Sequence, residues 1–162
     1  MDPRSSRDAL ETFLTSPAVH PTLALVYGRR RIGKSTLLQK LTADRGGFYW
    51  EATRGEPAVH LARLGKALGE HTGMGRFSFD GWDEALNQLR RVAEGRAIPV
   101  VLDEFGYLLE SDPTLDSYIA AALGPGARDD GAGRSRLILC GSAMAMMRAL
   151  TAGEAPLRGR AG

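Results

Sequence analysis

Apolar residues along the chain occur in two patterns, as short continuous runs and as runs spaced three or four residues apart. Continuous runs are typical of strands covered on both faces, and the wider spacing is typical of helices with one buried face. Four continuous runs predict strands at 23–27, 48–50, 98–102 and 137–140. Strands that alternate with helices predict an α/β fold with a parallel sheet and helices on both faces.

Helices are expected between these strands and at both ends of the chain. Helical spacing of apolar residues occurs near 6–16, from Lys34 to Gly46, from Pro57 through Leu68, from Trp82 through Leu89, from Pro113 to Leu123, and from Met144 to Gly153. Pro57 suits the first turn of a helix, and Asp80 and Asp112 are candidate caps. Segments 71–81 and 124–135 are rich in glycine and polar residues and are predicted loops.

Composition narrows the class of protein. A chain of 162 residues with 43% hydrophobic and 25% charged residues fits one soluble globular domain and argues against disorder. The longest apolar runs are far shorter than the ~20 residues of a membrane span, and the first residues lack the apolar stretch of a signal peptide. The expected location is therefore cytoplasmic, with no membrane partner.

Charge and side-chain chemistry exclude further classes. The net charge is only +2, and acidic residues interleave with the arginines, so composition predicts no domain-wide cationic face for nucleic acid. Cys140 is the single cysteine, which excludes an internal disulfide. The three histidines, at 20, 60 and 71, lack metal-ligand spacing.

The strongest chemical signal lies between the first predicted strand and the helix that follows it. It matches the phosphate-loop pattern G-x-x-x-x-G-K-S/T and consists of Gly28, Arg29, Arg30, Arg31, Ile32, Gly33, Lys34 and Ser35, with Thr36 next. From the composition of this chain, the pattern would arise by chance roughly once in two hundred such sequences. The position between a strand and a helix lowers those odds further.

This loop has the properties of an anion cradle. Gly28 and Gly33 allow the backbone to turn tightly around phosphates, and the helix that starts near Lys34 directs unpaired amides and its positive dipole end toward them. The Lys34 ammonium can reach the β- and γ-phosphates, and the Ser35 hydroxyl can bind Mg²⁺. The arginines at 29–31 could either be exposed to solvent or help to neutralise the phosphate charge, and the sequence leaves both alternatives open.

A second signal is the run IPVVLDE at 98–104, an apolar strand that ends in two acids. In open parallel sheets ligands bind at the carboxyl ends of the strands, so this pair should lie close to the phosphate loop. Asp103 is expected to hold Mg²⁺, usually through water, and Glu104 to orient and deprotonate the attacking water. A second acid beside the metal-holding one favours hydrolysis over phosphotransfer.

Two weaker signals stand nearer the end of the chain. Ser142 follows the last predicted strand, where its hydroxyl could either sense the γ-phosphate or cap the next helix. Arg158 and Arg160 could contact nucleotide, in this chain or in a neighbouring one, or could be solvated. The residues alone leave these alternatives open.

Taken together, four segments resemble one known family. YGRRRIGKSTLL, VLDEFGYLL, LILCGSAMAMM and APLRGR occur in the order found in the archaeal-type ATPases, a branch of the AAA+ P-loop ATPases, and the resemblance runs from about Leu23 to Arg160. It implies ATP as the nucleotide and a sensor role for Ser142. It also implies that Arg158 or Arg160 contacts the nucleotide.

The resemblance also implies a larger protein. Family members continue into a helical region, a winged helix and often a nuclease-like domain, so residues 1–162 are expected to be a single ATPase domain truncated at its C-terminus, with its last strand missing. The strand at 23–27 would then lie at a sheet edge prone to self-association, and nucleic acid would bind only through the missing domains. The leading function is a Mg²⁺-dependent ATPase that acts on attached domains or partners. The alternatives are a non-hydrolysing nucleotide-binding regulatory module and a phosphotransferase.

Overall fold

The computed structural model describes residues 11–15, 22–28, 34–92, 98–123 and 136–142. Its strands are β1 (Thr22–Gly28), β2 (Phe48–Glu51), β3 (Pro99–Asp103) and β4 (Arg136–Ser142), and its helices are α2 (Lys34–Asp44), α3 (Pro57–Thr72), α4 (Trp82–Arg91), α5 (Phe105–Ser111) and α6 (Leu115–Leu123). A helical turn at 11–14 belongs to the helix predicted near 6–16. The helix predicted from Met144 and the loop at 124–135 lie outside the described residues.

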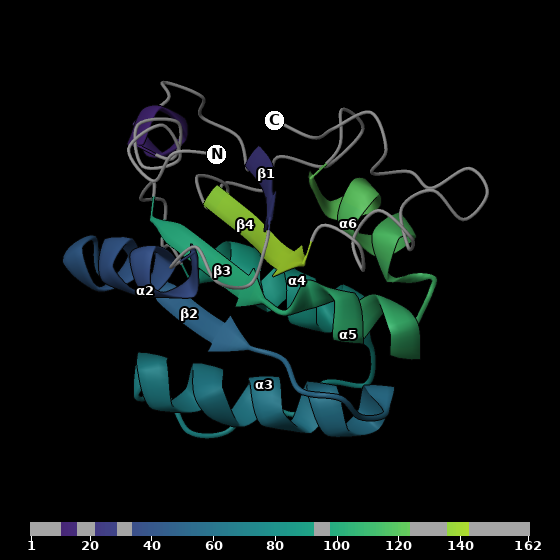
Figure 1. Cartoon of the computed structure of the whole chain (residues 1–162). Coiled ribbons are helices and arrows are strands. Elements are labelled where there is room, and N and C mark those ends of the chain that lie inside the picture. The colour runs from purple at the N-terminus through teal and green to yellow at the C-terminus, as the bar shows by residue number, and fades with distance from the viewer. Residues whose placement is uncertain (1–10, 16–21, 29–33, 93–97, 124–135, 143–162) are drawn as a thin grey trace.

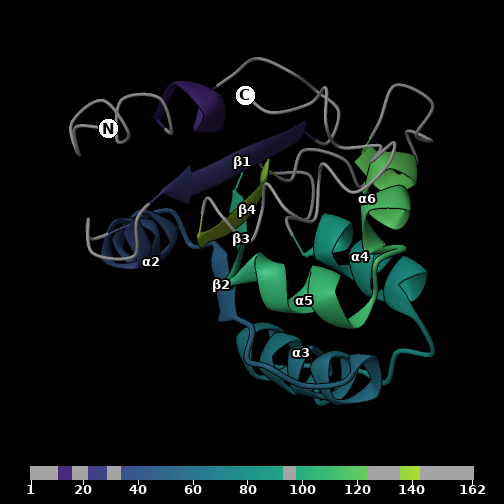
Figure 2. The same cartoon turned by 45° about the vertical axis from the view of Figure 1, so that its right-hand side comes forward.

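The four strands form one parallel sheet in the order β1-β4-β3-β2. The chain passes from β1 at one edge to β2 at the other with α2 on one face, and it returns through β3 and β4 with α3 to α6 on the opposite face (Figures 1 and 2). Right-handed crossovers place the helices of the two directions on opposite faces. The predicted three-layer α/β fold with a parallel sheet is therefore confirmed.

Side chains along the central strands alternate between two apolar clusters. On β3, Val100 and Leu102 face the larger cluster under α3 to α6, and Val101 faces the smaller cluster under α2. On β4, Leu139 faces the larger cluster and Ile138 faces the smaller one. Both faces of these strands are covered, which explains why each strand reads as a continuous apolar run.

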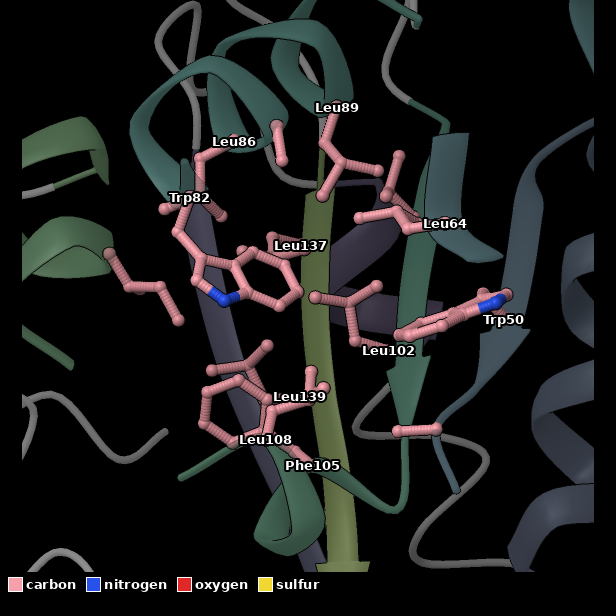
Figure 3. Close-up of a cluster of buried hydrophobic side chains, with 14 of the residues drawn as sticks. Trp50, Leu64, Trp82, Leu86, Leu89, Leu102, Phe105, Leu108, Leu137 and Leu139 are labelled. Carbon is pink, nitrogen blue, oxygen red and sulfur yellow. The ribbon is translucent and has the colours of Figure 1, made fainter. Parts of the chain in front are cut away.

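The larger cluster forms the main core of the described residues. Figure 3 shows the indole of Trp82 directed toward Leu102 and Leu137, with Phe105 and Leu108 farther along the same face. All five side chains are at most 3% exposed. Burying a side chain of this kind contributes about 1.5–3 kcal/mol, so this face supplies most of the hydrophobic stabilisation seen in the described part of the chain.

Two predicted helix ends agree with the structure. Pro57 is the first residue of α3, where its missing N–H costs nothing. After α2, Gly46 has φ of 65° and the Gly47 N–H donates to the Thr42 carbonyl at 2.8 Å, which stops the helix as expected from the two glycines.

The predicted cap at Asp80 is wrong. The residue before α4 is Gly81, and α4 has no side-chain cap. The Asp80 N–H instead donates to a carboxylate oxygen of Glu84 at 3.2 Å, so the acid in the first turn ties the helix to the segment before it. Asp112, by contrast, accepts from the Thr114 N–H at 3.1 Å and forms the turn before α6.

Helix α5 was not predicted. It has seven residues, begins directly after the acidic pair that ends β3, and carries Gly106 in its first turn. Its apolar residues are nearly continuous, so they show no helical period. None of the helices that the structure describes is both long enough and apolar enough to cross a membrane.

Candidate functional site

The carboxyl ends of the four parallel strands lie along one edge of the sheet. β1 and β4 end together, because Gly28 pairs with Ser142, and β2 and β3 end together, because Glu51 pairs with Asp103. β4 lies between β1 and β3. The end of the phosphate-loop strand, the end of β4 and the acidic end of β3 therefore share the edge at which open parallel sheets bind ligands.

Helix α2 begins close to this edge and packs against β2 and β3. Its first residue, Lys34, follows the last residue of β1 by six positions. The first turn of α2 holds no acidic side chain, so no carboxylate of this turn offsets the positive end of the helix dipole. Ser35 and the exposed Thr36 lie in this turn, whose amides have no acceptor within the helix.

The predicted site residues divide into two groups. The structure brings Gly28, Lys34, Ser35, Thr36, Asp103, Glu104 and Ser142 to the carboxyl edge, with Lys34, Ser35 and Ser142 placed through their backbone. The remaining predicted residues lie outside the described part of the chain, namely Arg29, Arg30, Arg31, Ile32, Gly33, Arg158 and Arg160.

Asp103 is fully buried, and both of its carboxylate oxygens accept hydrogen bonds. The backbone N–H of Glu104 donates to Oδ1 at 2.8 Å, and the Tyr49 hydroxyl donates to Oδ2. A buried carboxylate without such donors would be strongly destabilising. No sequence motif marks Tyr49, but its place opposite Val101 on β2 puts it on the face that carries Asp103.

Glu104 adopts an unusual backbone conformation. Its φ of 54° and ψ of 41° make it the one residue other than glycine with positive φ in the part of the chain described here. This left-handed conformation costs about 1–2 kcal/mol for a residue with a side chain. It turns the chain sharply from β3 into α5, and the Glu104 carbonyl accepts from the Tyr107 N–H at 3.1 Å. Strain of this kind is typical of functional sites.

A pocket of about 400 Å³ opens beside Glu104. Its lining comes from the end of β2, the loop that follows it, and the start of α5: Glu51, Ala52, Thr53, Arg54, Glu104 and Tyr107. The guanidinium carbon of Arg54 lies 5.6 Å from the centre of the Tyr107 ring, a cation–π distance. The half-buried residue Glu104 thus lines a space that a small polar molecule can enter.

A buried histidine fixes the outer wall of this pocket. His60 on α3 is fully buried, with Nε2 2.7 Å from the Thr53 carbonyl oxygen and Nδ1 3.1 Å from the Ser111 hydroxyl. Arg63 donates to the Thr53 hydroxyl at 2.9 Å. The carbonyl can only accept, so Nε2 carries the proton and donates to it. The loop after β2 is therefore tied to both α3 and α5.

These features define the class of fold. In the described sheet β4 lies between β1 and β3, and solved structures of archaeal ATPases match this chain, which supports an archaeal AAA+ or P-loop ATPase type of fold. No family model matches the sequence.

Two solved structures illustrate the likeness. The Walker-type ATPase PABY2304 of Pyrococcus abyssi superposes with a TM-score of 0.70 at 22% identity over 98% of this chain and 51% of its own. The ORC2 protein of Aeropyrum pernix, solved as ADPNP-ADP complexes, gives a TM-score of 0.62 at 20% identity, over 98% and 46% of the two chains. At these identities the likeness concerns the fold.

A curated relative by sequence is an uncharacterised protein of Methanocaldococcus jannaschii, MJECL04, which is 26% identical over 137 residues. The match covers 84% of this chain and 28% of the relative. The chain thus spans about half the length of the structures it resembles, and little more than a quarter of this relative.

Proposed function

We propose that this chain binds ATP with Mg²⁺, hydrolyses it, and passes its nucleotide state to attached domains or partners. The observation that carries this proposal is the meeting of two distant segments at one edge of the sheet. β1, which leads into α2, ends on one side of β4, and β3 ends in Asp103, followed by Glu104, on the other side, where α2 packs against β2 and β3. A triphosphate between them meets helix amides on one side and two acids on the other.

The phosphate-binding role belongs to residues 28–36. Backbone amides of the loop and of the first turn of α2 would surround the β- and γ-phosphates, because converging N–H groups at a helix start favour anions. The Lys34 ammonium supplies a point charge to the same phosphates. Ser35 and Thr36 complete the turn, and the arginines at 29–31 in the loop sequence would add positive charge.

The donor set at this edge fits Mg²⁺. The structure offers the buried carboxylate of Asp103 and the position of Ser35 at the start of α2, and Mg²⁺ binds one or two protein oxygens together with phosphates and water. When bound, the ion neutralises charge on the phosphate oxygens. The hydrogen bonds to Asp103 hold its carboxylate ready for this role.

Hydrolysis is assigned to Glu104. Glu104 is half-buried and lines a pocket that water can enter, where its carboxylate would orient a water molecule and take its proton. Ser142 ends the strand between the two acids and the phosphate loop, a position suited to sensing the γ-phosphate. Arg158 and Arg160 are proposed to contact the nucleotide, from this chain or from a neighbouring copy.

The neighbours support a domain within a larger protein. The Aeropyrum pernix protein was solved with ADPNP and ADP, and again in an ADP form. We propose that residues 1–162 form one ATPase domain of a larger cytoplasmic protein. Nucleic acid would bind only through the further domains of that protein. β1 is one of the two edge strands of the described sheet, and self-association through it is part of the proposal.

The proposal is tested by measuring Mg²⁺-dependent phosphate release from ATP by the unsubstituted chain and by Glu104→Gln. The substitution keeps the shape of the side chain and removes the base, so release should fall by about 100-fold or more while ATP still binds. Glu110→Gln, an exposed position on α5, is the matched control and should retain full activity. Equal phosphate release by Glu104→Gln and the unsubstituted chain would remove Glu104 from the reaction.

ATP binding without Mg²⁺-dependent release in the unsubstituted chain would instead favour the non-hydrolysing regulatory module. Transfer of the γ-phosphate to an added acceptor, with little release to water, would favour a phosphotransferase.

A further inference from the structure

We infer that Tyr49 is a positioning residue for the candidate magnesium site, acting through Asp103. This inference rests on the proposed function, because it assigns Tyr49 a role only if Asp103 takes part in binding the metal. It is carried by the hydrogen bond from the Tyr49 hydroxyl to Oδ2 of Asp103 and by the full burial of that carboxylate.

The sheet register explains why this tyrosine reaches this acid. β2 and β3 are parallel neighbours, with Tyr49 opposite Val101 and Glu51 opposite Asp103. Two residues of strand span about 6.6 Å. A tyrosine side chain that leans along its strand covers such a length, so the hydroxyl of Tyr49 meets the carboxylate two positions farther along the neighbouring strand.

Packing fixes the ring before the hydroxyl is considered. Tyr49 is partly buried and packs against the cluster under α2, which contains Leu38, Val101 and Ile138. Phe48 and Trp50, on either side of it, face the opposite cluster. The ring is thus held by apolar contacts, and the hydroxyl is the part of the side chain available for a polar function.

The two donors on Asp103 control its orientation. The Glu104 N–H holds Oδ1 from the chain side, and the Tyr49 hydroxyl holds Oδ2 from the neighbouring strand. With a donor on each oxygen, the carboxylate cannot rotate without losing a hydrogen bond in a buried setting, which costs free energy. A carboxylate fixed in this way loses less conformational entropy when it binds a metal, directly or through water.

The test compares ATP affinity with and without Mg²⁺ in the unsubstituted chain and in Tyr49→Phe. The variant keeps the ring and deletes one oxygen. Loss of a hydrogen-bond partner of a metal ligand typically weakens metal binding by 10-fold or more, so the gain in ATP affinity on adding Mg²⁺ should shrink by about 10-fold. ATP affinity without Mg²⁺ should stay within about 2-fold, a split that general damage to the fold would not produce.

Two controls locate the effect. Tyr118→Phe, at a position on α6 that is 42% exposed, should behave as the unsubstituted chain does. In an Asp103→Asn background, adding Tyr49→Phe should change the Mg²⁺ dependence no further, because the hydroxyl acts through that carboxylate. A full second effect in this background would overturn the inference.

A second measurement needs no substitution. In protein with ¹³C-labelled tyrosine rings, the Tyr49 resonance, identified by its contacts with Val101, should shift when Mg²⁺ is added to the ATP-saturated chain. An unchanged resonance, or an unchanged Mg²⁺ gain in folded Tyr49→Phe, would overturn the inference while leaving ATP binding intact. Failure of Mg²⁺ to raise ATP affinity in the unsubstituted chain would instead overturn the proposed function.

Discussion

The two faces of the sheet differ in what they bury. Under α3 to α6 lies a large cluster that includes Trp82, Phe105 and Leu102, whereas the described residues under α2 form a smaller cluster that ends, at the carboxyl edge, in the Tyr49–Asp103 pair. Neighbouring residues on one strand can therefore serve different purposes. The face under α3 to α6 supplies most of the apolar burial. The face under α2 has less apolar contact and places buried polar groups at the edge where a ligand would bind.

The largest expected effect is on the apolar face. Leu102→Ala removes a fully buried side chain from the large cluster and should lower the free energy of unfolding by about 2–5 kcal/mol, measured by urea denaturation. ATP affinity, measured below the unfolding transition, should be unchanged, because Leu102 faces the cluster under α3 to α6 and points away from Asp103 and α2. A fall in ATP affinity with little loss of stability would show that the two faces do not have the separate roles described here.

The next effect concerns the pocket wall, which His60 ties to the helices on the side of the large cluster. His60→Ala leaves a cavity and removes partners from the Thr53 carbonyl and the Ser111 hydroxyl, so the free energy of unfolding should fall by about 3 kcal/mol. Thermal or urea unfolding measures this loss. Lys66→Ala, an exposed position on the same helix, should change stability by about 0.5 kcal/mol or less. Equal stability of the two variants would show that the His60 bridge contributes nothing.

The smallest effect has opposite signs at two glutamates. Glu104→Gly should raise the free energy of unfolding by about 1 kcal/mol, because glycine adopts the left-handed conformation without strain. Glu110→Gly, in the last turn and a half of α5, should lower it by about 1 kcal/mol. Phosphate release should be lost only in Glu104→Gly. Destabilisation by both substitutions would argue against strain stored at Glu104.

Much of the fold could be predicted because its strands are buried on both faces. The runs at 98–102 and 137–140 are continuous and apolar, and β3 and β4 lie there. Helix α5 could not be found in this way. Its start depends on the left-handed turn at Glu104, a conformation with no sequence signature in a residue that is neither glycine nor asparagine.

The candidate site could be predicted only where its residues are contiguous in sequence. The phosphate loop and the acidic pair each form a local motif, and the prediction that they meet follows from the rule for parallel strands. Tyr49 and Asp103 are 54 residues apart in the chain. Their contact depends on the pairing of β2 with β3 and on the register of that pairing. The tie from His60 to Thr53 and Ser111 likewise depends on how α3 and α5 pack.

The central claim is that the start of α2 and the end of β3 act on one ligand. It is tested most directly by a double-mutant cycle in which the affinity for ATP with Mg²⁺ is measured for the unsubstituted chain, Lys34→Ala, Asp103→Asn and the double variant. If both residues act on the same magnesium-bound triphosphate, the two losses should be non-additive by more than about 0.5 kcal/mol. Losses that add to within about 0.3 kcal/mol, or no loss in either single variant, would contradict the account.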